Sequence, residues 1–254
     1  MTVTVRSDTL VLQSHRRPVP APWFVRCLDS VGEWAESSGF AYRFEGDLLF
    51  ERLPADLRER TAAQPVVAAD LARLEGLAAA LQEGYRRVVW MDADTLVIDP
   101  RRLVLPEVDY ALGREVWIQS DSRGRLRAYM KVHNAFLLIA SGNPFLDFYR
   151  HAAARVVRAH GGAMVPQLVG PKLLTALHNL VSFPVVERAG VLPPAVARDL
   201  LAGGGPALAL FRDRSSEPPA ALNLCASLVE SELSEAEVAA VIELLSRCAA
   251  GPKD

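Results

Sequence analysis

The sequence predicts an α/β fold in which a mostly parallel central sheet is flanked by helices. Segments typical of strands and of helices alternate along residues 1–100, as they do in proteins with parallel sheets. Half of the 254 residues are hydrophobic and 23% are charged, which supplies a sizeable core. The apolar run RVVWM stops just before two aspartates, Asp92 and Asp94, and ligands of such sheets bind where strands end.

Five elements are expected in the first part of the chain. They are a strand over residues 8–15, a helix from about residue 23 to 37, a strand over residues 40–47, a helix over residues 66–85 and a strand over residues 87–91. Two prolines flank Ala21 and delay the start of the first helix. The second helix has a stripe of leucine and alanine side chains at helical spacing, with Gly84 as its C-terminal cap.

The second part of the chain gives fewer clear signals. A strand is expected over residues 133–141, a helix over residues 143–162, a turn over residues 203–206, a short strand over residues 207–211 and a loop over residues 211–222. The last helix is well marked, because Ser234 and Glu237 form a capping box and Leu233 and Val238 a hydrophobic staple. We expect the whole chain, residues 1–254, to form one domain.

Composition argues against several classes of function. A net charge of −2 does not suit a nucleic-acid-binding protein, which usually has a basic excess. No apolar run reaches about 18 residues, so no membrane span is expected, and the N-terminus lacks the features of a signal peptide. Cys27, Cys225 and Cys248 lie far apart without a CxxC motif, which fits a cytoplasmic protein that has neither disulfides nor cysteine-bound zinc.

The pair Asp92 and Asp94 points to metal chemistry. Residues two apart in a strand or tight turn point the same way, so both carboxylates are expected to face one position. Adjacent carboxylates repel each other, and a divalent cation removes that repulsion. Mg²⁺ and Mn²⁺ bind oxygen ligands, typically one or two protein carboxylates together with substrate phosphates. A cation held this way neutralises charge on a departing nucleoside diphosphate.

Two other interpretations of this pair are possible. The first is a solvated turn between two strand segments, with Asp99 as a further turn residue. The second is the motif of haloacid-dehalogenase-type phosphatases, which requires Thr or Val two residues after the second aspartate. Leu96 occupies that position here, Thr95 comes one residue too early, and the phosphatase motif usually lies on the first strand. The apolar flanks on both sides of the pair favour metal binding.

The segment over residues 70–100 resembles the centre of the GT-A glycosyltransferases, which carry a DxD signature for sugar nucleotides. More narrowly, it is similar to DxD-motif transferases of the capsular-polysaccharide type and to bacterial relatives in natural-product pathways. A looser likeness extends over residues 22–47, 132–149 and 168–177. The resemblance implies a GT-A fold, with about residues 1–100 binding a sugar nucleotide and about residues 101–254 binding the acceptor. It implies metal-dependent, hexosyltransferase-like transfer from a UDP- or GDP-sugar to a hydroxyl acceptor, with Mn²⁺ or Mg²⁺ as cofactor and retention at the anomeric carbon.

The resemblance also implies roles for individual residues. Asp94 would bind the metal directly, and Asp92 would contact the ribose, the sugar or metal-bound water. Asp70 and Arg73 lie on one helix face and match an Asp and an Arg that contact the donor, although an ordinary surface ion pair has the same spacing. Asn134 matches a polar residue that relatives place beside the bound sugar, so we group it with Asp92 and Asp94 as catalytic.

Four further residues are candidates for binding the donor. Gln13, Ser14 and His15 end the first strand, where the family binds base and ribose, although they also suit a plain polar strand end. Lys172 follows Pro171 at an expected helix start, and it would either bind phosphate or remain solvated.

The resemblance weakens in the second half of the chain. Many members of the family close the metal site with a late histidine or acidic residue, but the last histidine here is His178. Asn223 lies about where such a ligand would be and is the candidate third metal ligand. Arg212 and Arg214, in the expected loop, would fold over the diphosphate and exclude water, unless that loop is plain surface. The missing late ligand leaves open a degenerate sugar-nucleotide or metal-binding module with a partner-binding role.

Overall fold

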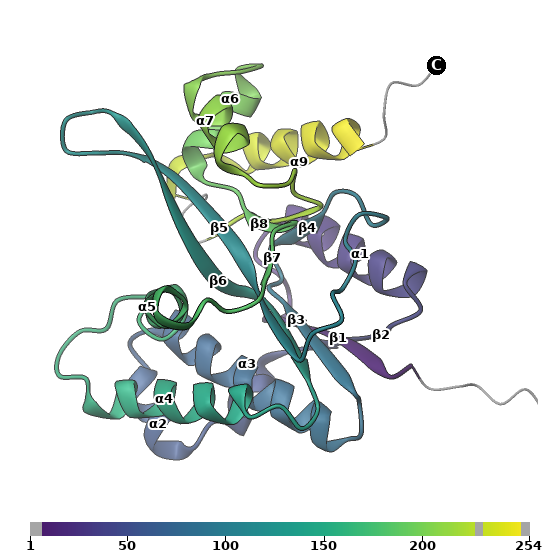
Figure 1. Cartoon of the computed structure of the whole chain (residues 1–254), viewed down its shortest axis with the longest axis vertical. Helices are drawn as coiled ribbons and strands as arrows, with labels where there is room; N and C mark the ends of the chain where they lie inside the picture. Colours follow the sequence, from purple (N-terminus) through teal and green to yellow (C-terminus); the bar gives the residue numbers. More distant parts are fainter. Residues whose placement is uncertain (1–6, 227–230, 250–254) are drawn as a thin grey trace, which may run out of the picture.

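A six-stranded sheet runs through the centre of the protein (Figure 1). In this computed structural model, which describes residues 7–226 and 231–249, the strand order is β2-β1-β3-β6-β5-β7. The strands are β1 (Thr9–Ser14), β2 (Ala41–Glu45), β3 (Arg87–Met91), β5 (Tyr110–Ser120), β6 (Leu126–Ala140) and β7 (Val185–Val186). Strand β6 is antiparallel to both of its neighbours, and the other pairings in this sheet are parallel. The prediction of a mostly parallel sheet in an α/β fold is therefore confirmed.

Helices cover both faces of this sheet. One face carries α3 (Pro65–Gln82), α4 (Phe145–Ala159), α5 (Pro171–Val181), the short α2 (Ala55–Thr61) and the 3-10 helix η1 (Asp47–Arg52), and the other face carries α1 (Pro22–Ser37). Successive side chains of β1 point to opposite faces. Leu10 and Leu12 pack in one hydrophobic core with Leu74 of α3, whereas Val11 packs in another core with Trp34 of α1. Burial on both faces explains why the strand sequences are almost continuously apolar.

A three-stranded sheet and a group of three helices complete the described part of the fold. The sheet contains β4 (Thr95–Val97), β9 (Ala221–Asn223) and β8 (Ala189–Val191), and the helices α6 (Pro194–Leu201), α7 (Pro206–Arg214) and α9 (Glu235–Ala249) share one core. Thr95 of β4 is opposite Asn223 of β9 in the register. A turn joins β3 to β4, with 3.0 Å between the backbone nitrogen of Thr95 and the carbonyl oxygen of Asp92. Asp92 and Asp94 therefore lie where the chain passes from one sheet to the other.

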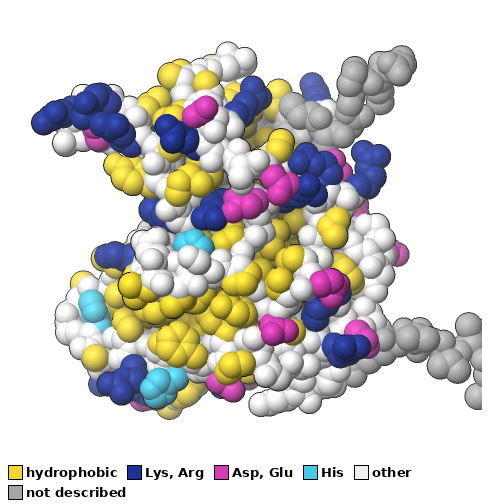
Figure 2. Space-filling model, viewed as in Figure 1, with side chains coloured by type: hydrophobic (Ala, Val, Ile, Leu, Met, Phe, Trp, Pro, Cys, Tyr) yellow, Lys and Arg dark blue, Asp and Glu magenta, His cyan; other side chains and the backbone are white. Residues whose placement is uncertain are grey.

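Strands β5 and β6 continue beyond the other strands as a two-stranded hairpin (Figure 1). The strand expected over residues 133–141 starts too late, because β6 begins at Leu126. Alternating arginines give this segment the appearance of a polar loop. In the structure Leu126 and Ala128 pack against the core of α6, α7 and α9. Arg125 and Arg127 are exposed and share Asp121 at the hairpin tip, where Figure 2 shows basic side chains gathered together.

Residues 207–211 belong to helix α7, so the short strand expected there is wrong. Arg212 and Arg214 accordingly lie in the last turn of this helix rather than in a loop. Pro206 occupies the first turn of α7, and the carboxylate of Asp199 in α6 accepts the N–H of Leu208 at 2.9 Å. An apolar run of this length does not distinguish a helix from a strand, and the deciding contact comes from a different helix.

The other long elements agree with the sequence to within a few residues. Helices α1, α3 and α4 and strands β1, β2 and β3 lie where they were expected. The capping box before α9 is present, since the backbone nitrogen of Ser234 donates to Oε2 of Glu237 at 2.8 Å. No helix within the described residues is long and apolar enough to cross a membrane. Cys27 and Cys225 are free cysteines, and the side chain of Cys248 lies outside the described part of the chain.

Candidate active site

Asp94 is anchored to the segment that follows β9. Its Oδ1 accepts the side-chain amide of Asn223, 2.5 Å from Nδ2, and its Oδ2 accepts the backbone N–H of Ala226 at 2.8 Å. Asn223 is itself held in place, because its Oδ1 accepts the N–H of Cys225 at 3.0 Å. The orientation of the Asp94 carboxylate is thus fixed by a part of the chain far away in sequence.

Asp92 is held by a different set of donors, on β3 and α3. The indole N–H of Trp90 donates to Oδ1 of Asp92 at 2.6 Å, and Nη1 of Arg73 lies 2.9 Å from the same oxygen. The Asp92 side chain is 26% exposed, so part of the carboxylate stays accessible to a ligand. Both candidate acids are therefore oriented in advance, each by its own partners.

Arg73 is the buried centre of this cluster. Its Nη2 lies 3.0 Å from Asp70, and its Nη1 donates to the carbonyl oxygen of Asn134 at 2.6 Å. The amide nitrogen of Asn134 in turn donates to Asp70 at 2.8 Å. Asp70 and Arg73 are only 3% and 5% exposed, so their interaction is not a surface ion pair. The guanidinium of Arg73 thus connects Asp70 of α3 and Asp92, which follows β3, to strand β6.

Helix α4 and the turn before α5 close the cluster. The hydroxyl of Tyr149 lies 3.5 Å from the amide nitrogen of Asn134 and donates to the carbonyl of Val169 at 2.8 Å. Gly170 packs so closely that a Cβ there would lie 2.6 Å from Oδ2 of Asp70 and 2.9 Å from Oδ1 of Asn134. That separation is shorter than real Cβ contacts, so any side chain at this position would force its surroundings to shift.

Burial shifts the protonation of the acids in this cluster. It raises the pKa of Asp70 to about 6, although the neighbouring charge of Arg73 and the hydrogen bond from Asn134 act in the opposite direction. Burial and, next, the charge of Asp92 raise the pKa of Asp94 above its usual range. Both shifts mean that negative charge is disfavoured here, so a cation bound between Asp92 and Asp94 would relieve repulsion.

The oxygens of this site suit a divalent cation that shares its coordination with a substrate. Asp92 and Asp94 supply carboxylates, which Mg²⁺ and Mn²⁺ prefer. In residues 7–226 and 231–249, no group of three or more His, Cys, Asp or Glu side chains could hold a metal ion. Asn223 lies beside Asp94, but its nitrogen rather than its oxygen faces that carboxylate. The residues therefore fit an ion that takes its remaining ligands from phosphate groups, and they do not fit an ion held by protein side chains alone.

The side chain of His133, next to Asn134 in β6, is buried and contacts backbone groups through both ring nitrogens. Its Nε2 lies 3.1 Å from the carbonyl oxygen of Ala189, and its Nδ1 accepts the N–H of Ala135 at 3.2 Å. A Cβ at Gly113 would collide with the imidazole ring. Burial lowers the pKa of His133 to about 4, so the ring is neutral at physiological pH.

The structure brings Gln13 into contact with the candidate turn. Its Nε2 donates to the carbonyl oxygen of Asp92 at 3.1 Å, and its Oε1 accepts the hydroxyl of Tyr42 at 2.9 Å. Ser14 and His15 follow at the same end of β1, and the Ser14 hydroxyl donates to the carbonyl of Gly46 at 3.2 Å.

Three candidate cations are exposed at helix ends. Lys172 is exposed in the first turn of α5, as expected for a helix that starts at Pro171. Arg212 and Arg214 are exposed at the end of α7, and Arg214 pairs with its neighbour Asp213 at 3.1 Å. Within the described part of the chain, no hydrogen bond or ion pair joins Lys172, Arg212 or Arg214 to the acids.

Three members of the cluster were not candidates from the sequence. From the sequence, Trp90 was interpreted as a core residue. Its position two residues before Asp92 puts both side chains on the same side of a strand, so the sequence could have predicted their contact. Tyr149 and Gly170 lie in the segments of looser likeness, but neither was expected to contact this cluster, because their contacts depend on how α4 and α5 pack.

Comparison with known proteins gives only distant likenesses. No family model matches the chain, and no curated protein matches it. A glycosyltransferase involved in glycosylation of the major capsid of PBCV-1 is similar over 93% of this chain and 99% of its own, at 10% identity and a TM-score of 0.46. Galactosyltransferase LgtC, in complex with donor and acceptor sugar analogues, is similar over 92% of this chain and 95% of its own, at 14% identity and a TM-score of 0.43. Since these identities and scores are low, the functional conclusion rests on the site itself.

Proposed function

We propose that the protein is a metal-dependent glycosyltransferase of the GT-A type, which moves a sugar from a UDP- or GDP-sugar to a hydroxyl acceptor with retention at the anomeric carbon. The observation that supports this most directly is the turn after β3, where Asp92 and Asp94 present two pre-oriented carboxylates. Ligands of α/β sheets bind at such strand ends. Gln13, at the end of the neighbouring parallel strand β1, contacts the same turn.

In this proposal Asp92 and Asp94 hold Mn²⁺ or Mg²⁺ together with the diphosphate of the donor. Such an ion, when bound, neutralises the charge of the departing nucleoside diphosphate. Residues 1–100 then supply the donor side of the site, and residues 101–254 the acceptor side.

The buried members of the cluster act as positioning residues. The guanidinium of Arg73, 2.9 Å from the Asp92 carboxylate, fixes the orientation of that side chain. Asn134 is 4% exposed and its amide is bonded to Asp70, so it acts through Asp70 and Arg73 rather than on the sugar itself. This role differs from the catalytic one that the sequence suggested for Asn134.

Release of nucleoside diphosphate from a panel of UDP- and GDP-sugars, measured with Mn²⁺ and without it, tests the proposal. We expect release that depends on Mn²⁺ and that falls to background in Asp92→Asn and Asp94→Asn. Asp99→Asn is the matched control, because Asp99 follows β4 at its far end and its carboxylate accepts the backbone N–H of Arg101, two residues later. Full activity in Asp94→Asn, or no release from any donor, would contradict the proposal.

A second candidate function is a degenerate sugar-nucleotide-binding module with a partner-binding role. It is favoured by one observation, that both oxygens of Asp94 are already hydrogen-bonded while no third acid or histidine in the described residues completes a metal site. A ligand that binds only the folded state raises the melting temperature. Stabilisation by UDP or GDP with Mn²⁺, without any turnover of UDP- or GDP-sugars, would identify the module and exclude the enzyme.

A further inference from the structure

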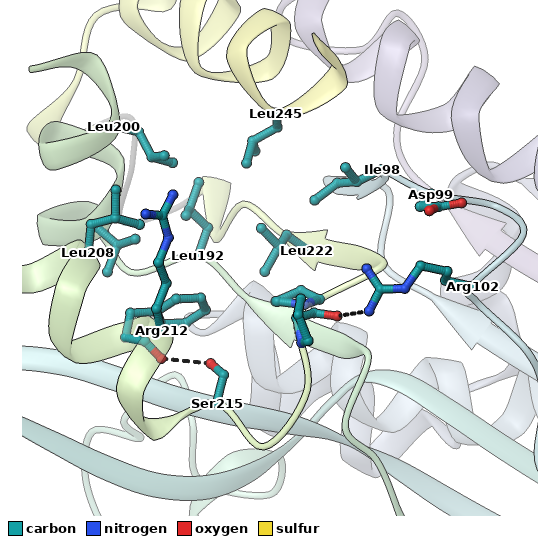
Figure 3. Close-up of a pocket in the computed structure, with 14 residues that line it drawn as sticks. Ile98, Asp99, Arg102, Leu192, Leu200, Leu208, Arg212, Ser215, Leu222 and Leu245 are labelled. Atoms are coloured by element: carbon teal, nitrogen blue, oxygen red, sulfur yellow. Dashed lines mark hydrogen bonds between the residues drawn. The ribbon is translucent and has the colours of Figure 1, made fainter. Parts of the chain in front are cut away.

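A separate pocket of about 440 Å³ lies between the three-stranded sheet and the helices α6, α7 and α9 (Figure 3). Its walls are mainly apolar, and the sheet and each of the three helices contribute a leucine: Leu200 of α6, Leu208 of α7, Leu222 of β9 and Leu245 of α9. Sites for small molecules typically span roughly 300–1,000 Å³ and are mostly apolar. The pocket therefore has the size and the lining of a site for a small molecule.

Two arginines give this apolar pocket its charge. In Figure 3 the side chain of Arg212 runs along the wall beside Leu208, and Arg102 reaches in from the opposite side. Arg102 donates to the carbonyl of Pro218 at 3.0 Å. Neither guanidinium forms an ion pair with an acid among the described residues, whereas nearby Arg198 pairs with Glu232 at 2.5 Å.

Among the described lining residues, the one acid does not cancel these two charges. Asp99 lines the same rim, but its carboxylate accepts the N–H of Arg101 at 3.1 Å and lies 3.7 Å from the Arg101 side chain. Two guanidinium groups thus remain available for an oxyanion. Guanidinium groups bind carboxylates and phosphates through paired, charge-assisted hydrogen bonds.

We propose that this pocket binds a small amphipathic anion, with its apolar body among the leucines and its carboxylate or phosphate between Arg102 and Arg212. The two parts of the ligand match the two parts of the pocket: burial of an apolar chain is favourable, and the head group pairs with two cations that lack an acid among the described residues. The site is distinct from the candidate active site, because Asp94 precedes β4 and the pocket begins beyond its other end, at Ile98. The proposal goes beyond the proposed transfer reaction and does not depend on it.

A series of four decyl compounds that differ only in head group tests the charge requirement. Decanoate, decyl phosphate, decanol and decyltrimethylammonium are titrated into the full-length protein below their micelle concentrations, and binding is followed by calorimetry and by the melting temperature. We expect the two anions to bind and to stabilise the protein, decanol to bind at least about tenfold more weakly, and the cation not to bind. Equal binding of decanol and decanoate, or no binding of either anion, would overturn the proposal.

Variants locate the site. Arg212→Gln should weaken decanoate binding about tenfold, since one charge-assisted interaction is lost, and should leave decanol binding unchanged. Arg214→Gln is the matched control, because Arg214 lies two residues further along the same helix and does not line the pocket. Leu208→Trp, which fills the pocket, should abolish binding of all the decyl compounds; a circular dichroism spectrum like that of the wild type shows that this variant is folded. Unchanged decanoate binding in both Arg212→Gln and a folded Leu208→Trp would place the ligand elsewhere and overturn the assignment.

Discussion

Arg73 of α3 forms ion pairs with Asp70, one turn earlier on the same helix, and with Asp92, at the end of β3. The guanidinium is almost completely buried, and it also donates to the backbone of β6 through the carbonyl of Asn134. A single cation therefore compensates two acids that come together only in the folded chain. This arrangement makes the cluster sensitive to any change at Arg73.

Arg73→Gln should destabilise the protein by about 3–5 kcal/mol, because removing one partner of a buried ion pair leaves an uncompensated charge. Arg73→Lys should recover only part of this loss, since an ammonium lacks the planar fork that reaches two carboxylates. The free energy of unfolding of both variants, measured in urea, tests these expectations. Arg158→Gln is the control, because Arg158 pairs with Asp56 on the surface and its loss should change stability little. Equal stability of the Arg73 and Arg158 variants would contradict the central role of Arg73.

Gly170→Ala should disturb the same cluster by steric contact alone. The new Cβ would lie 2.6 Å from Asp70 and 2.9 Å from Asn134, so the backbone before α5 has to move away. We expect a loss of roughly 1–3 kcal/mol, the usual effect of overpacking. At Gly161 nothing lies within 4 Å of the corresponding position, so Gly161→Ala should be tolerated. If Gly161→Ala lowered the melting temperature as much as Gly170→Ala does, the loss of stability in Gly170→Ala could not be attributed to crowding around Gly170.

His133 should make the protein lose stability in mild acid. Its pKa is lowered to about 4 in the folded state, whereas the unfolded chain takes up a proton near 6.5. The stabilisation is complete above pH 6.5 and is lost as the pH falls towards 4, in total about 3 kcal/mol. His133→Gln has no such titration, so its free energy of unfolding should vary less over this range. The raised pKa of Asp70 acts in the opposite direction in both proteins and cancels in the difference. Parallel pH profiles for the two proteins would refute the prediction.

Asn223→Asp tests whether a cation binds beside Asp94. A third carboxylate replaces the amide that now donates to Asp94, so without divalent ions the variant should lose roughly 1–3 kcal/mol of stability. Mn²⁺ should then raise the melting temperature of the variant more than that of the wild type, because three acids bind the ion better than two. Asn179→Asp, exposed on α5, should show neither effect. If Mn²⁺ leaves the variant unchanged, no cation site exists at this turn.

Local patterns in the sequence predict most of the core of the fold. Helices α1 and α3 and strands β1 and β3 have strong periodicity and clear boundaries, and they lie where expected. Helix α7 and the first half of β6 were missed for the same physical reason. Each has a short or mixed pattern, and its conformation is decided by contacts with other elements, such as the capping of Leu208 by Asp199.

The candidate site was predictable to the extent that the order of the strands determines it. Asp92, Gln13 and Asn134 come from three neighbouring strands, and Asp70 and Arg73 from the helix that precedes one of them, so topology alone brings them together. Contributions from loops and from helix packing were not predictable. Hence the contact of Gly170 with Asp70 was not foreseen, and Arg212, expected in a loop, lies in the last turn of a helix.

The length of β6 links two remote parts of the molecule mechanically. Its first residues stand in the hairpin that carries the arginines of the tip, and its middle carries Asn134 beside Asp70. From Leu126 to His133 each residue of β6 pairs with β5, and the register shifts at Asn134. A bulky partner bound at the outer end would therefore tilt the paired ribbon as far as this irregularity, where the carbonyl oxygen of Asn134 accepts a hydrogen bond from Arg73.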